Sequence, residues 1–409
     1  MLPLLWSQAT LIGKARQPML EARSSRAGTY RSQPTGYRAF YPAPLPPDPP
    51  LRLSRELQVL LSQADRALGR LDGSVETLPN PDLFVFMYVR KEAVLSSQIE
   101  GTQSSLQDLL AAEANLFGTE TLPRDVDDVV NYVRAMNHGL KRLETLPVSM
   151  RLISEIHAEL LQGVRGNRLT PGEIRRSQNW IGPGGCTLAT ATYVPPPPEE
   201  LPKALGALER FLHEQNDLPA LIRIGLAHAQ FETIHPFLDG NGRVGRLLIT
   251  FLLTEKGILQ KPVLYLSHHF KQHRQAYYDH LQAVRVEGDW EGWLAFFLRG
   301  VAEVSQEASL TARRILALRE QHRTLITDHL GRAAANGHRV LESLFDRPIV
   351  SVNAIEALIA TTYPAANNLV GRLEALGILR EMTGQKRHRR FCYQPYIELF
   401  GDAPHEVVA

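Results

Sequence analysis

This 409-residue sequence contains only two cysteines, Cys186 and Cys392. Two thiols are too few for a disulfide framework, and they suit a reducing compartment. We therefore expect a cytoplasmic protein. No apolar run approaches the ~20 residues needed to cross a bilayer, so no membrane association is expected. The apolar opening MLPLLW has no small-residue cleavage site, which argues against a signal peptide. A formal net charge of +2 gives no overall bias toward nucleic acid or lipid.

Two common nucleotide-binding loops are also missing. The phosphate-binding pattern G-x-x-x-x-G-K-[ST] does not occur. GNGRVG, at 240–245, satisfies G-x-G-x-x-G, but a dinucleotide-binding loop needs a strand before it, and the residues before this one have helical periodicity. Hydrophobic residues make up 44% of the chain, which is enough for two or three domains with cores of their own.

Apolar residues recur at helical spacing through most of the chain. This pattern predicts helices over 51–71, 82–101, 105–114, 125–143, 149–163 and 201–215, and a long connecting helix over 298–335. Asp72-Gly73 and Pro79-Asn80-Pro81 are expected to interrupt the chain between the first two helices. Residues 1–50 lack the pattern and end in a proline-rich stretch, so they form either a surface arm or a disordered tail.

Residues 235–246, HPFLDGNGRVGR, carry the densest chemistry in the chain. Helical patterns flank them on both sides, so they are expected to form a loop that leads into a buried helix. The first N–H groups of a helix attract phosphate oxygens, and Gly240 and Gly242 let the backbone approach a ligand closely. Arg243 and Arg246 lie three positions apart, so both project from one helix face and can clamp phosphates.

The same stretch contains a carboxylate and an imidazole. Asp239 offers a hard oxygen ligand that suits the magnesium ion accompanying a nucleoside triphosphate. His235 has a reference pKa of about 6.5, so it can take a proton from a hydroxyl group at neutral pH.

HPFLDGNGRVGR resembles the signature of the Fic family, H-P-F-x-[DE]-G-N-G-R-x-x-R, and agrees with it at every fixed position. The resemblance implies an all-α core with a small β-hairpin flap. It also implies a nucleotidyltransferase that moves AMP from ATP, with Mg²⁺, to a Ser, Thr or Tyr hydroxyl of a target protein or of itself. His235 would be the general base, Asp239 the metal ligand and Phe237 the anchor of the loop in the core. The implied ATP-binding positions are His235, Pro236, Phe237, Leu238, Asp239, Gly240, Asn241, Gly242, Arg243, Arg246 and Tyr277.

Within that resemblance, Asn241 and Gly242 would form the anion hole for the α-phosphate, and the two arginines would hold the outer phosphates. Tyr277 would contact the adenine or its sugar, with Tyr278 as an alternative and a core role open for either. Residues 178–181 and 190–194, around a Gly-Pro-Gly-Gly turn, predict two strands that resemble the family's target-binding flap. A surface hairpin without a substrate role is the alternative.

SSQIEG, at 96–101, fits S/T-x-x-x-E-[GN], which resembles the inhibitory motif of Fic proteins. The resemblance implies that Glu100 pairs with Arg246 and keeps the γ-phosphate from seating productively. Ser96, one helical turn earlier, could hold the carboxylate in place. An ordinary solvated helical glutamate is the alternative interpretation.

Other polar residues are interpreted as structural. Asp125, Asp127 and Asp128 suit a helix start better than a metal site. His157 and His138 are read as ordinary helix residues. The four histidines between His268 and His280 are read as solvated or satisfied rather than as zinc ligands, because neither their spacing nor a nearby cysteine supports a structural zinc site.

The C-terminal residues predict a winged-helix domain. Helical pieces at 338–346, 351–360 and 365–379 precede a hairpin with the basic run Lys386, Arg387, His388, Arg389 and Arg390. Asn367, Asn368 and Arg372 are the candidate recognition-helix residues. DNA binding and protein binding are weighed equally for this domain.

The predicted division of the chain is an N-terminal arm with the inhibitory helix over 1–120, a catalytic core over 121–300, a connecting helix over 301–335 and the winged helix over 336–409. The first functional hypothesis is an autoinhibited protein adenylyltransferase. The others are a DNA-binding regulator with a nucleotide-sensing core, and a Fic enzyme that uses another donor or removes AMP. Homodimerisation is a further expectation from the resemblance.

Overall fold

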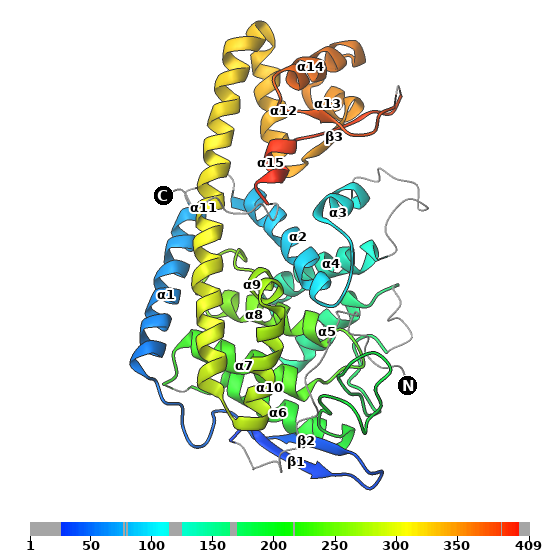
Figure 1. The fold of residues 1–409 in the computed structure, drawn as a ribbon. Coiled ribbons are helices and arrows are strands. Elements are labelled where there is room, and N and C mark those ends of the chain that lie inside the picture. The colour runs from blue at the N-terminus through cyan, green and yellow to red at the C-terminus, as the bar shows by residue number, and fades with distance from the viewer. Residues whose placement is uncertain are drawn as a thin grey trace.

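The computed structural model describes residues 26–400 apart from 77, 79–80, 114–124, 164–169, 216 and 386. Figure 1 shows a large helical lobe at the bottom, a smaller lobe at the top and one long helix that joins them. The predicted mostly helical fold with a small sheet is confirmed. Within the described part of the chain, none of the helices combines the length and the apolar character that a membrane crossing requires.

The large lobe is built around two consecutive buried helices. They are α7 (Ala220–Ile234) and α8 (Asn241–Glu255), and nearly all of their residues are buried. Around them pack α4 (Val126–Arg142), α5 (Met150–Leu160), α6 (Leu201–His213), α9 (Ser267–Gln272) and α10 (Arg274–Glu287), with the 3-10 turn η2 (Pro198–Glu200) before α6. The helices predicted over 125–143, 149–163 and 201–215 are therefore present.

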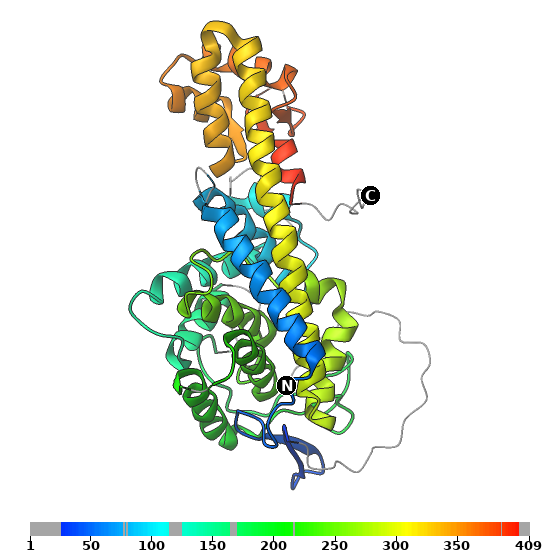
Figure 2. The same ribbon diagram turned by 90° about the vertical axis from the view of Figure 1, so that its left-hand side faces the viewer.

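The connecting helix α11 (Trp290–Leu330) begins earlier than predicted and is continuous for 41 residues. Helix α1 (Arg55–Glu76) lies along it in both views (Figures 1 and 2). The predicted interruption at Asp72-Gly73 is wrong. Leu71 and Val75 are four residues apart and both buried, so packing of that face holds the helix together through the glycine.

Helix α2 (Pro81–Ile99) agrees closely with the helix predicted over 82–101. It ends one residue before Glu100 of the predicted inhibitory motif. It packs against α4, α8, α9 and the short α3 (Leu106–Glu113). Gly101 has a φ of +103°, a conformation that glycine adopts without strain, so the chain leaves the helix sharply after Glu100.

Strands β1 (Gly28–Ser32) and β2 (Arg38–Pro42) form an antiparallel hairpin at the base of the large lobe. No strand is predicted in this region. Ala39 and Phe40 are fully buried, and the Phe40 N–H donates to the Val194 carbonyl at 2.9 Å. The hairpin therefore supports the segment predicted as a flap. In that segment the pairing is the isolated bridge Ile181–Tyr193, so among the described residues neither predicted stretch forms a full strand. The first half of the predicted arm, residues 1–25, lies outside the described residues.

The small lobe has the predicted winged-helix arrangement, whose elements are η3 (Gly331–Ala333), α12 (Ala334–Asp346), β3 (Ile349–Ser351), α13 (Val352–Ile359), α14 (Tyr363–Ala375), β4 (Arg380–Glu381), β5 (Arg390–Cys392) and α15 (Gln394–Glu398). Its sheet has the order β3-β5-β4, and β3 is a strand that the sequence pattern does not predict. Of the basic run, Lys386 lies outside the described residues.

Candidate active site

The predicted loop lies between α7 and α8. Helix α7 ends at Ile234, and the next residue, His235, has a left-handed backbone (φ +49°). Helix α8 begins directly after Gly240 (φ +75°). Asn241 closes the loop from inside, because its side chain accepts from the Phe237 N–H and donates to the Phe237 carbonyl, both at 2.8 Å. Phe237 is fully buried, in agreement with its predicted role as anchor. Since the Asn241 side chain is used in this way, an anion could receive only its main-chain N–H.

Two side chains from residues 170–180 brace this loop, and the sequence analysis missed both. Arg175 is 2% exposed, and its Nε donates to the His235 carbonyl at 3.0 Å. Asn179 donates to the Phe237 carbonyl at 2.8 Å. The backbone N–H of Arg175 also donates to the Pro236 carbonyl at 2.9 Å. No periodicity marks these residues, because they lie in irregular chain and act on a loop some 60 residues later.

His157 lies on a helix, as predicted, and it is also a third side chain that braces the loop. Its ring is stacked on Phe237, with the centroids 3.8 Å apart. The Gly172 N–H donates to Nδ1 at 2.8 Å, so Nε2 carries the proton and donates to the Asp239 carbonyl at 3.1 Å. Burial lowers the pKa of His157 to about 4, which keeps this tautomer neutral.

His235 is the first residue of this braced loop and is buried, and its ring interacts with the backbone of Glu232 in the last turn of α7. Burial, followed by the charges of Arg175 and Arg285, lowers the pKa of His235 to about 3. The imidazole is therefore neutral over the physiological range, and a neutral imidazole is the form that can accept a proton.

The two predicted phosphate-binding arginines lie on α8 and are both buried. The Arg243 guanidinium lies 3.6 Å from the Asp239 carboxylate and 4.0 Å from that of Asp128. Asp128 therefore faces the site, although it was interpreted only as a helix-start charge.

Arg246 is held by the end of α2. Its Nη2 donates to Glu100 Oε1 at 2.7 Å, and its Nε donates to Ser96 Oγ at 2.8 Å. The predicted Glu100–Arg246 contact is thus present. Ser96 has a different place from the predicted one, because its hydroxyl and carbonyl oxygens accept from the arginine and do not hold the carboxylate.

Gly242 explains how Glu100 reaches this position. A Cβ at residue 242 would collide with Glu100 Oε1, so only glycine leaves room for the carboxylate over the first turn of α8. The carboxylate therefore lies over the helix start at which phosphate binding is predicted.

Two further carboxylates lie around Arg246. Glu92 and Glu232 are buried, and burial raises the pKa of each to about 7, against the opposing charge of Arg246. The Glu92 carboxylate accepts from Tyr132 and Ser267, whereas Glu232 Oε1 has no partner within the described residues. Neither residue is marked as unusual by the sequence pattern.

Tyr277 is buried, and its hydroxyl lies 3.0 Å from His228 Nε2. Its ring stacks on Phe270 with the centroids 4.5 Å apart. These contacts place Tyr277 in the core around Arg246, and its proposed contact with adenine remains a prediction.

The fold and this site define a helical protein in which a braced loop carries a neutral imidazole and leads into a helix with two buried arginines. The family models described as "Fic/DOC family N-terminal" and "Fic/DOC family" match residues 58–141 and 147–253, and the model described as "HTH DNA binding domain" matches 338–391. Residues 58–141 and 147–253 therefore form the N-terminal and central domains of the Fic/DOC type.

Its curated relatives include proteins named "Protein adenylyltransferase Fic". The one from Culex quinquefasciatus is 32% identical over 197 residues, which cover 48% of this chain and 35% of the relative. The one from Drosophila yakuba is 28% identical over 264 residues, which cover 62% of this chain and 47% of the relative. The chain therefore spans less than half the length of these relatives.

A solved structure has the same fold. It is a Fic family protein from Desulfovibrio desulfuricans G20, with a TM-score of 0.55 and 20% sequence identity. The match covers 84% of this chain and 97% of that one. Because only 20% of the aligned residues are identical, this similarity shows a shared fold and nothing about activity.

Proposed function

We propose that this chain is an autoinhibited protein adenylyltransferase, which transfers AMP from ATP to a hydroxyl side chain of a protein. The observation that supports it most directly is the loop itself, which carries the neutral imidazole of His235 and leads into a helix with two buried arginines. Relatives named protein adenylyltransferase agree with this proposal.

In the proposed reaction, His235 takes the proton from a Ser, Thr or Tyr hydroxyl of the target. The freed oxygen attacks the α-phosphorus of ATP, the bond from that phosphorus to the α,β-bridging oxygen breaks, and pyrophosphate leaves. The N–H groups at the start of α8 face the α-phosphate, and Arg243 and Arg246 bind the outer phosphates. Stabilisation of charge on the phosphate oxygens supplies most of the acceleration.

Asp239 fits the magnesium ion that ATP carries. Its side chain is 32% exposed, Oδ1 accepts the neighbouring Gly240 N–H at 2.7 Å, and Oδ2 lies 3.6 Å from the Arg243 guanidinium. A carboxylate oxygen at the loop edge is the ligand type that Mg²⁺ takes alongside phosphates. The bound ion would neutralise charge on the triphosphate.

The Glu100–Arg246 contact is the proposed inhibitory device. While Arg246 donates to Glu100 and Ser96, it cannot donate in the same way to a γ-phosphate. The anionic carboxylate also repels phosphate from the turn over Gly242. ATP would therefore bind in its productive position only after α2 and α8 separate at this contact.

The first test compares Glu100→Gly with the double variant Glu100→Gly/His235→Ala. Both are incubated with α-labelled ATP and magnesium, and the protein-bound label is measured. We expect labelling of the single variant and a loss of at least about 100-fold in the double one, within the range assigned to general base catalysis. Glu100→Gly/His213→Ala is the matched control, because His213 is exposed at the end of α6. Equal labelling with and without His235 would disprove the mechanism.

Intact-mass analysis of Glu100→Gly with each nucleoside triphosphate in turn tests the donor. An adenylyl adduct with ATP alone supports the proposal. An adduct with another nucleotide, or removal of AMP from an adenylylated protein, would support the alternative chemistries on the same fold.

DNA binding is a second candidate function, carried by the small lobe. The helix-turn-helix family model covers it, and its hairpin presents Arg387, Arg389 and Arg390. Arg389 donates to Asn367 of α14 at 2.6 Å, which ties the wing to the predicted recognition helix. A mobility shift with upstream DNA, for wild type and Arg387→Ala/Arg390→Ala, tests it. A salt-dependent shift that the variant loses supports DNA binding, and its absence favours a protein partner.

A further inference from the structure

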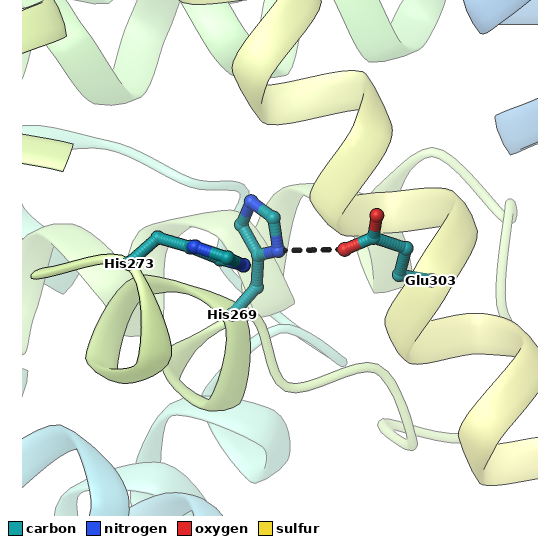
Figure 3. Close-up of side chains that lie close together, drawn as sticks. All are labelled: His269, His273 and Glu303. Atoms are coloured by element: carbon teal, nitrogen blue, oxygen red, sulfur yellow. Dashed lines mark ion pairs between the residues drawn. The ribbon is translucent and has the colours of Figure 1, made fainter. Parts of the chain in front are cut away.

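We infer that His269, His273 and Glu303 form a binding site for one divalent transition-metal ion, separate from the active site. The two histidines lie one helical turn apart at α9, and Glu303 projects from α11. Figure 3 shows the three side chains turned toward one another. Their nearest ligand atoms all lie within 4.8 Å of one another.

His269 is the best evidence that this is a site. Its side chain is 3% exposed, and neither ring nitrogen forms a hydrogen bond within the described part of the chain. Its Nδ1 lies 3.0 Å from Glu303 Oε2. A buried imidazole without hydrogen bonds is costly, so an unpaired nitrogen that faces a carboxylate is well suited to a cation.

The neighbouring helix is shaped to let this imidazole in. Gly300 lies one turn before Glu303 on α11, and a Cβ there would collide with the His269 ring. Phe296, one further turn back, packs on the same ring, with the centroids 4.7 Å apart. The position of His269 is therefore set by packing, and it does not depend on Glu303.

The spacing of the donors fits a single ion. Two ligands at ~2.0–2.1 Å from a tetrahedral zinc ion lie about 3.3 Å apart, close to the 3.0 Å between His269 Nδ1 and Glu303 Oε2. His273 and Glu303 are exposed, so their side chains can turn to complete the set. His268 does not contribute, since its Nε2 lies 3.2 Å from Glu307.

The donor types select the class of ion. Two imidazoles and one carboxylate suit Zn²⁺, Co²⁺ or Ni²⁺, whereas Mg²⁺ prefers oxygen ligands. The ring of His269 presents Nδ1 to the cluster, 3.0 Å from Glu303 Oε2, so a nitrogen ligand faces the place where the ion would bind. Three protein ligands leave a position for water, and a bound ion would link α9 to α11.

The test uses the untagged, chelator-treated full chain. Co²⁺ is added while its visible absorption is recorded, and bound Zn²⁺ is counted by elemental analysis after gel filtration. We expect one ion per chain and a melting temperature that rises with Zn²⁺ concentration. His273→Ala and Glu303→Gln, which alter exposed side chains, should each weaken binding by about tenfold or more. Far-UV circular dichroism checks that both variants are folded.

Two controls isolate the site. His280→Ala removes a histidine of the next helix that lies outside the cluster, and Asp239→Asn removes the proposed magnesium ligand. Both should bind Co²⁺ like wild type. The inference would be overturned if the wild type bound neither Co²⁺ nor Zn²⁺. It would also be overturned if His273→Ala and Glu303→Gln bound these ions as tightly as the wild type does. Metal binding by Glu100→Gly/Asp239→Asn, together with loss of the labelling shown by Glu100→Gly, would separate this site from the proposed function.

Discussion

Replacement of Glu100 by glycine should activate the protein, and the structure allows the size of the effect to be worked out. The Glu100 carboxylate accepts from Arg246 at 2.7 Å, and the side chains are 39% and 2% exposed. Two charges about 4 Å apart interact by about 4 kcal/mol at an effective dielectric constant of 20. Because more than a third of Glu100 is exposed, solvent screening and the cost of desolvating Arg246 reduce this value to about 1–3 kcal/mol.

That energy must be overcome before Arg246 can donate to a phosphate. Its removal should raise the labelling rate at subsaturating ATP by about 5-fold to 150-fold. Glycine costs the fold little here, because Glu100 lies just beyond the last residue of α2. The assay is the initial rate of label incorporation from α-labelled ATP, with the melting temperature measured in parallel.

Two variants separate charge from space. Glu100→Gln keeps the size of the side chain over Gly242 but removes its charge, so we expect a smaller rise than with glycine. Glu113→Gln breaks the pair between Glu113 and Arg90, which also involves α2 but lies away from the loop, and should leave the rate unchanged. The reasoning is refuted if folded Glu100→Gly labels no faster than wild type, or if Glu113→Gln activates equally.

Three further predictions follow from the buried charges and from the wing. Since burial lowers the pKa of His235 to about 3, the imidazole in Glu100→Gly should stay unprotonated near pH ~6.5, and the labelling rate should not fall there as the pH is lowered. A fall in the rate at that pH that no substitution of another residue removes would contradict the assigned pKa. Burial raises the pKa of Glu92 from its ordinary 4.5 to about 7, so the native state binds the extra proton between these values and stability falls as pH rises through that window. Glu92→Gln should therefore raise the free energy of unfolding by up to about 3 kcal/mol at about pH 8.5 and by much less at about pH 5, as measured by denaturant titration; an equal change at both pH values would disprove the buried-charge account. If the wing binds DNA phosphates, Arg387→Ala and Arg390→Ala should each reduce the steepness of log affinity against log salt concentration by about 1. Arg66→Ala, which alters an exposed side chain of α1, should leave this slope unchanged. Fluorescence anisotropy at several salt concentrations measures the slope.

The local organisation of the chain could be predicted from the sequence alone. Helical periodicity placed α2, α4, α5 and α6 within a few residues, because each buries an apolar face that recurs every three to four positions. The loop at 235–241 and its two arginines were also predictable, since their chemistry lies in one short stretch. Asp72-Gly73 was misjudged because packing of Leu71 and Val75 outweighs the glycine's low helix propensity.

Only the tertiary structure decided which distant residues meet. Arg175 lies in irregular chain and His157 lies on a helix whose periodicity does not mark it, yet both hold the loop. The Ser96 hydroxyl binds Arg246, whereas the prediction paired it with the Glu100 carboxylate. Glu303 joins two histidines some 30 residues earlier because α9 and α11 pack together. A sequence shows the periodicity of one element at a time, whereas these contacts depend on how whole helices pack, and that is set by the summed burial of all their faces.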